Sequence, residues 1–273
     1  MTTCIADTDA IATSRFWQTR IAGGRKPPHP PALPQWKTGM HQCLSWMERQ
    51  SYRAVTRRFP LYPSIWKLGC HLATEIGWRP AWDVWRLAMS ATVLRTFWQD
   101  HGLPRTVVLI GDGYGFLAAL LSRLCTARIW SVELPDMMPL QIETFRRAHA
   151  PIVVLSPREA AGLPEWIDCA VNVCSMQEMT EANVAFYFRL LRPRSAPQSH
   201  FYCVNRLEKD LGADGVRRFH EYPWTPQDTV YLDEPCPYFR HRFLTRAPYR
   251  VRFEICWHRL VHLAPACSEE RAR

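Results

Sequence analysis

The sequence predicts an α/β fold, in which a Rossmann-like, mostly parallel sheet with one late antiparallel strand follows an N-terminal helical segment. Three observations predict it. From Arg105 onward, short apolar runs alternate with stretches of helical periodicity, which is typical of a parallel sheet covered on both faces. A glycine-rich turn, residues 111–115, directly follows the first apolar run. Over residues 39–103, ahead of the first apolar run, the chain shows helical periodicity.

Composition divides the 273 residues into four parts. Residues 1–38 are expected to form a partly disordered arm, because five prolines between Lys26 and Pro34 favour an extended spacer. Residues 39–103 are predicted to be a helical cap segment. Residues 104–264 are predicted to be the cofactor-binding sheet domain, and residues 265–273 a tail.

The helical segment is expected to hold three helices. The first covers residues 39–58, and the second covers residues 64–76 with Ser64 as its N-cap. Pro80 can open the third, which runs to about His101 and is closed by Gly102.

The sheet domain is expected to alternate strands and helices from its first residue. Apolar runs rich in β-branched residues predict the strands, and spacing of three and four between apolar residues predicts the helices. The predicted strands are 106–110, 127–132, 151–155, 167–173 and 200–204, with late strands at 229–232 and 249–257; the predicted helices are 116–124, 136–148 and 181–191.

Charge and cysteine usage limit the class of protein. The net charge of +9 can attract anions, but no run of five basic residues occurs. We therefore expect a solvated, arginine-rich surface, with a polyanion site as the alternative. The ten cysteines form no Cys-x-x-Cys, no uncharged apolar stretch approaches the length of a membrane span, and no signal peptide is visible. The expected location is the cytoplasm.

The glycine turn reads Gly111-Asp112-Gly113-Tyr114-Gly115. A dinucleotide-binding turn would place its third glycine at position 116, where this chain has Phe, and the Gly-Lys-Ser/Thr of a phosphate-binding loop is absent. The G-x-G-x-G spacing instead favours S-adenosylmethionine (SAM). Glu133 stands at the expected end of the second strand, where a carboxylate can accept both hydroxyls of a ribose. The alternative is a tight packing turn beside an unrelated surface glutamate.

Three sequence blocks carry a resemblance to a known family. They are Val107–Gly115, Val132–Asp136, and Val171–Met179 followed by Phe201–Arg206. On these blocks, over roughly residues 105–206, the chain resembles a bacterial family of sugar O-methyltransferases within the class I SAM-dependent methyltransferases. The resemblance implies a methyltransferase that uses SAM as its cofactor. Leu109 departs from the family, which has Glu there to hold the cofactor's amino group.

The expected function is SAM-dependent methylation of a hydroxyl of a sugar or glycosylated small molecule. The expected cofactor-binding residues are Gly111, Asp112, Gly113, Tyr114, Gly115, Glu133, Ser156, Asn172 and Gln177. Asn172 can instead cap a turn.

A sugar hydroxyl is a weak nucleophile, so a general base or a metal should assist its attack. The sequence shows no clear metal triad, so independence of a metal is expected. Glu178 and His220 are the candidates. Glu178 can instead complement a helix dipole, and His220 can instead belong to an aromatic loop that packs on the core. Arg206 can clamp an acidic acceptor or form a structural ion pair.

Two other functions stay open at this stage. Leu109 favours a non-catalytic partner or scaffold with a methyltransferase fold. The net charge of +9 favours a nucleic-acid methyltransferase, although the Asn-Pro-Pro-Tyr type of motif is missing after Asn172. The expected partner is a small-molecule acceptor; neither a membrane nor a nucleic acid is expected.

Overall fold

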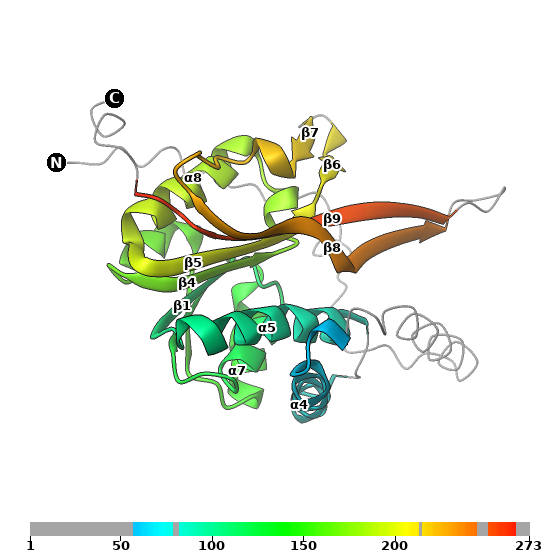
Figure 1. Ribbon diagram of the computed structural model, residues 1–273. Helices are drawn as coiled ribbons and strands as arrows, with labels where there is room; N and C mark the ends of the chain where they lie inside the picture. The colour runs from blue at the N-terminus through cyan, green and yellow to red at the C-terminus, as the bar shows by residue number, and fades with distance from the viewer. Residues whose placement is uncertain (1–56, 79–81, 213–214, 245–250, 266–273) are drawn as a thin grey trace.

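The structure, a computed structural model, describes residues 57–78, 82–212, 215–244 and 251–265. Within them, seven strands form one sheet in the order β3-β2-β1-β4-β5-β9-β8 (Figure 1). The strands are β1 (Thr106–Ile110), β2 (Arg128–Val132), β3 (Ile152–Leu155), β4 (Ile167–Val173), β5 (Ser195–Arg206), β8 (Thr229–Leu244) and β9 (Val251–His262).

Strand directions confirm the predicted fold class. β1 to β5 pair in parallel, and β9 pairs antiparallel with both β5 and β8. The five parallel strands therefore end at one edge of the sheet, called the carboxyl edge below, on the side toward which the β8–β9 hairpin projects in Figure 1.

Helices cover both faces of the central part of the sheet, where β1 and β4 are buried along both sides. α4 (Tyr62–Glu75), α5 (Trp82–His101), α6 (Phe116–Leu121) and α7 (Met138–Arg147) lie on one face, and α8 (Glu181–Leu191) on the other (Figure 1). Two buried apolar clusters correspond to these faces. No helix of the described chain combines the length and apolar character needed to cross a bilayer.

Short elements complete the chain between the long ones. They are the hairpin β6 (Glu208–Asp210) and β7 (Val216–Arg218), and the 3₁₀ turns η2 (Pro157–Gly162), η3 (Met176–Glu178), η4 (Arg192–Arg194) and η6 (Phe219–Glu221). Sequence periodicity did not predict the β6–β7 hairpin. It also predicted two strands that are too short: 229–232, where β8 continues to Leu244, and 200–204, where β5 runs from Ser195 to Arg206.

The predicted N-cap Ser64 is wrong. The helix begins at Tyr62 with Leu61 as its N-cap, and Pro63 occupies the first turn, where its missing N–H costs nothing. The Ser64 hydroxyl donates back to the Leu61 carbonyl at 2.8 Å. Gly102, in contrast, has φ of +90° and donates its N–H to the Trp98 carbonyl, as expected of a residue that closes a helix.

The described part of the predicted cap segment packs on the sheet. α4 and α5 share one buried cluster with β1 and α6. The division into four parts and the role of residues 39–103 as a cap stay predictions. The arm 1–38, most of the predicted helix 39–58 and the residues after 265 lie outside the described chain.

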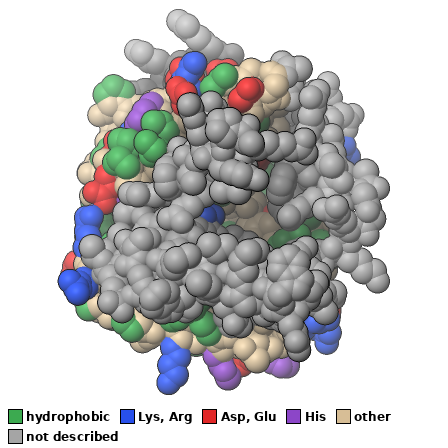
Figure 2. Space-filling model, turned by 90° about the vertical axis from the view of Figure 1, so that its right-hand side faces the viewer, with side chains coloured by type: hydrophobic (Ala, Val, Ile, Leu, Met, Phe, Trp, Pro, Cys, Tyr) green, Lys and Arg blue, Asp and Glu red, His purple; other side chains and the backbone are tan. Residues whose placement is uncertain are grey.

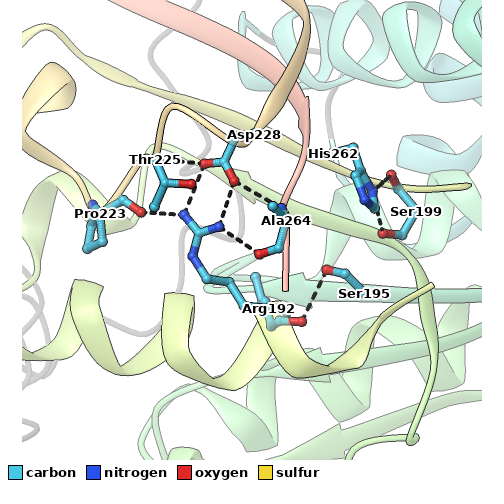
Figure 3. Close-up of polar contacts among 9 residues, drawn as sticks. Arg192, Ser195, Ser199, Pro223, Thr225, Asp228, His262 and Ala264 are labelled. Atoms are coloured by element: carbon cyan, nitrogen blue, oxygen red, sulfur yellow. Dashed lines mark hydrogen bonds and ion pairs between the residues drawn. The ribbon is translucent and has the colours of Figure 1, made fainter. Parts of the chain in front are cut away.

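A buried ion pair fastens the edge of the sheet opposite the carboxyl edge (Figure 3). Arg192, just after α8, donates to both oxygens of Asp228 at 2.6 and 2.9 Å, and to the carbonyls of Pro223 and Ala264. The two side chains are 8% and 2% exposed. The pair therefore joins α8, the segment before β8 and the chain that leaves β9.

Candidate functional site

The glycine loop lies at the carboxyl edge, between β1 and α6. Gly111 donates its N–H to the Val132 carbonyl at 2.9 Å, which fixes the loop beside the end of β2. Gly115 has φ of +84°, and a Cβ there would lie 2.6 Å from the ring of Phe145 on α7. A Cβ on Gly111 would collide with Ser175 after β4. Both glycines are therefore required by close packing against neighbouring elements.

Glu133 is brought directly against this loop. Its Oε2 accepts the N–H of Gly113 at 2.7 Å, and its Oε1 accepts the N–H of Leu134 at 3.0 Å. The side chain is only 6% exposed, and burial raises the pKa of the Glu133 carboxyl to about 7 although both N–H groups lower it. The predicted acid thus lies beside the predicted loop, at the end of the second strand.

Asp112 lies in the glycine loop, four residues before α6 begins. Its carboxylate accepts the N–H groups of Ala118 at 2.8 Å and Leu117 at 3.3 Å. Burial raises the pKa of the Asp112 carboxyl to about 8; the Ala118 N–H opposes this rise, and the nearby Glu133 carboxylate adds to it. Asp112 therefore braces the loop against the helix.

Leu109 lies in the core. It is 1% exposed and belongs to the cluster on the α5 face. Tyr114 is half-buried, and its ring lies edge-on against Trp78 with 5.8 Å between the centroids. Trp78 in turn stacks on Phe116, so this side of the loop rests on an aromatic layer.

Asn172 connects the ends of two neighbouring strands. Its amide nitrogen donates to the Ile110 carbonyl at 2.8 Å and to the Ser175 hydroxyl, and its oxygen accepts from Met176 N and Asn205 Nδ2. The residue is fully buried. All of its hydrogen-bonding capacity is used inside the protein, so contact with a cofactor would require exchange of one of these bonds.

Gln177 continues the same network toward β5. Its Oε1 accepts the N–H of Arg206 at 2.7 Å, and its own N–H donates to Asn205 Oδ1 at 3.0 Å. Its side-chain nitrogen reaches Glu178 at 3.3 Å. Gln177 is 3% exposed, so in this structure it holds η3 against β5.

Ser156 directly follows β3 and closes a local turn. Its N–H and hydroxyl both donate to Glu159 Oε2 at 2.8 Å. Ser156 thus lies after the third strand, at the same edge of the sheet as the glycine loop, and its contact with the cofactor stays a prediction.

The two candidate bases have different neighbours. Glu178 is half-buried in η3 and lies 3.5 Å from Lys209 Nζ of β6. His220 is exposed in η6, and its ring lies edge-on to Trp257 at 4.8 Å. Glu178 thus adjoins the amide network of the carboxyl edge, whereas His220 lies on the outer part of the sheet over β9.

Two aromatic residues near His220 are committed to the core. Tyr222 is 4% exposed. Trp224 contacts Phe188 at 4.8 Å between centroids, and the guanidinium of Arg259 lies 4.6 Å from its ring. These rings serve packing, in line with the alternative interpretation of this aromatic loop.

Figure 2 shows the side of the molecule that carries the carboxyl edge. Basic and hydrophobic side chains of the described residues are visible at the centre of this face. Within the described residues, no three His, Cys, Asp or Glu side chains gather as a metal-binding group.

Comparison with known proteins yields structural likenesses only. No family model and no curated protein matches the chain. It is similar to a SAM-dependent methyltransferase from Clostridium acetobutylicum, with 12% identity, coverage of 64% of this chain and 90% of that chain, and a TM-score of 0.46. It is also similar to an O-methyltransferase from Bacillus cereus in complex with S-adenosylhomocysteine (SAH), with 15% identity, coverage of 64% of this chain and 80% of that chain, and a TM-score of 0.44. A third similar structure is TehB from Haemophilus influenzae, with 13% identity, coverage of 62% of this chain and 61% of that chain, and a TM-score of 0.46. Likeness at this level does not assign an activity to the chain.

Sequence reasoning missed two residues of the site. Gln141 on α7 is fully buried and donates to Glu133, and Ser175 packs on Gly111. A glutamine in an amphipathic helix gives no signal in a single sequence, because only the fold shows which face it presents to the sheet.

Proposed function

We propose that the chain is a SAM-dependent O-methyltransferase that acts on a hydroxyl of a sugar or glycosylated small molecule. One observation carries the proposal: Glu133, at the carboxyl end of β2, accepts the N–H of Gly113 at 2.7 Å. This bond joins the glycine loop and the ribose-binding acid in one site, at the sheet edge where open α/β folds bind ligands.

The residues present fit the cofactor. A carboxylate offers about four acceptor positions. Glu133 uses two of them on Oε2, for Gly113 and Gln141, and one on Oε1, for Leu134. A ribose hydroxyl can therefore add to Oε1 without displacing a protein donor. The Asp112 and Glu133 carboxyls at this end of the site can also ionise when a cation binds, which suits a cofactor that carries a sulfonium.

When bound, SAM supplies a methyl group activated by positively charged sulfur. The protein's task is then to align an acceptor oxygen with that methyl, which is chiefly a matter of proximity and orientation. Glu178 is the first candidate to accept the hydroxyl proton, because it lies at the carboxyl edge beside the amide network. His220 is the second candidate. The sugar acceptor rests on the family resemblance of the Val171–Met179 and Phe201–Arg206 blocks.

Titration calorimetry with SAM and with its product S-adenosylhomocysteine (SAH) tests the cofactor. We expect both to bind, and a Gly113→Arg variant to lose binding while staying folded. Gly162→Arg is the matched control, since a Cβ at Gly162 meets nothing within 4 Å. Folded wild-type protein that fails to bind millimolar cofactor would refute the proposal. That result would favour a non-catalytic scaffold with a methyltransferase fold, the alternative that Leu109 supports.

Mass spectrometry tests the acceptor. Incubation with SAM and a panel of glycosides and nucleotide sugars should yield a product heavier by one CH₂. Methyl labelling of RNA in place of every glycoside would instead support the nucleic-acid methyltransferase.

A further inference from the structure

Gln141 is a polar side chain buried completely beside the candidate ribose acid. It lies on α7 and is 0% exposed. Its Nε2 donates to Glu133 Oε2 at 3.1 Å, and its Oε1 accepts the hydroxyl of Ser131 at 2.9 Å. A buried amide is costly unless both of its ends are satisfied, and here both ends are.

The hydrogen bonds at both ends give the amide one direction. The Ser131 hydroxyl donates to Oε1 of Gln141, and the NH₂ group points at Glu133 Oε2, which also accepts the Gly113 N–H. An ionised carboxylate can only accept hydrogen bonds, so this direction favours the charged form of Glu133. Ser131 and Glu133 lie two residues apart at the end of β2, and their side chains therefore share the face that α7 covers.

The two carboxylate oxygens of Glu133 accept different numbers of hydrogen bonds. Oε2 receives two donors, Gly113 N at 2.7 Å and Gln141 Nε2 at 3.1 Å. Oε1 receives one, Leu134 N at 3.0 Å. Gln141 thus holds one oxygen in place and leaves the other with acceptor capacity. Without it, Glu133 keeps only backbone donors, and its carboxyl plane can turn.

We propose that Gln141, aligned by Ser131, is a positioning residue that orients Glu133 for recognition of a ribose hydroxyl of the cofactor. This inference rests on the proposed function. Gln141 does not itself touch the cofactor; it acts through the carboxylate.

Calorimetry with SAH and with its 2′-deoxy and 3′-deoxy analogues tests the proposal. Wild-type protein should bind SAH at least about tenfold more tightly than the weaker deoxy analogue, since a hydrogen bond to a charged group contributes that much. In Gln141→Leu the ratio of the two dissociation constants should fall to within about threefold, because a turned carboxylate no longer reads the hydroxyl. A purely structural role would weaken SAH and the analogues alike and leave the ratio unchanged.

Two further variants complete the experiment. Thr144→Val is the matched control: Thr144 is buried one turn farther along α7, and its hydroxyl bonds the Leu140 carbonyl, so the ratio should keep its wild-type value. Ser131→Ala should lower the ratio partway, and adding it to Gln141→Leu should change nothing further. Ser131→Ala also decides the matter if Gln141→Leu does not fold.

The failures are distinguishable. Wild-type protein that binds neither SAM nor SAH would overturn the proposed function itself. Binding of SAH with a ratio that stays at its wild-type value in both Gln141→Leu and Ser131→Ala would overturn only the role of Gln141.

Discussion

Replacement of Arg192 by Met should destabilise the protein strongly. The change keeps an unbranched apolar stem but removes the guanidinium that bonds Asp228 twice and the Pro223 and Ala264 carbonyls once each. Asp228, 2% exposed, is then left as a buried charge without its cation. Figure 3 shows that Arg192 and these partners come from three separate segments, so the loss loosens the whole edge of the sheet.

The size of the effect follows from what remains around Asp228. Removing one partner of a buried ion pair costs about 3–5 kcal/mol. Asp228 keeps two donors, the N–H groups of Thr225 at 2.8 Å and Ala264 at 2.9 Å, so we expect the lower end, about 3 kcal/mol. That is a large fraction of the roughly 5–15 kcal/mol by which a domain is stable.

Urea unfolding at pH 7 measures this loss, with Arg146→Met as the control because the Arg146–Glu143 pair is exposed and should not shift the midpoint. Acid adds a second check. Burial would raise the pKa of Asp228, but the hydrogen bonds from Arg192, Thr225 and Ala264 outweigh it and hold the pKa below its ordinary value. Its stabilisation is present above the unfolded pKa and lost as pH falls through the folded pKa, so the two proteins should converge in acid. A loss under about 1 kcal/mol at pH 7 would contradict the reasoning.

Three other predictions concern the site. Gly115→Ala should lose cofactor binding, and thermal melting should show that it destabilises the protein more than Gly102→Ala does. Both glycines have positive φ, but a Cβ would lie 2.6 Å from an aromatic ring at Gly115 and would meet nothing within 4 Å at Gly102. Glu178→Gln should lower kcat about 100-fold or more while SAH affinity, measured by calorimetry, changes less than about twofold; an unchanged kcat would remove Glu178 as the base. SAM affinity should rise between about pH 6 and 9, and binding should release protons. The pKa values of Glu133 and Asp112 are about 7 and about 8, and a cationic ligand favours the ionised form of both carboxyls. An affinity that does not change with pH would contradict this.

Much of the fold could be predicted because its signals are local. β4 and α8 have the bounds that periodicity gave, since an apolar run and an amphipathic helix each end at recognisable residues. The β6–β7 hairpin could not be predicted, because Glu208-Lys209-Asp210 carries no apolar alternation. Ser64 failed as an N-cap because Pro63 allowed the helix to begin earlier.

The site was predictable as a set of strand ends and less so as a set of contacts. The glycine loop and Glu133 follow from spacing along β1 and β2, which the parallel register preserves in space. Asn172 was located correctly at a strand end, but its contacts with Ile110 and Asn205 depend on the β1–β4 and β4–β5 pairings, which a single sequence does not encode. Gln141 was missed because only the fold shows which face of α7 meets the sheet.

The fold contains two sets of buried carboxyls, one in a structural ion pair and one at the candidate site. Asp228 lies against Arg192, and its pKa is lowered, so it stabilises the chain at neutral pH. At the glycine loop, burial raises the pKa values of Asp112 and Glu133, and within the described residues their bonding partners are N–H donors rather than cations. A carboxyl with a raised folded pKa costs stability as pH rises above its unfolded value. The chain forms a complete ion pair at one edge of its sheet and keeps two carboxyls without a cation at the other. Under the proposed function, the stability lost there lies where the sulfonium-bearing cofactor supplies the positive charge.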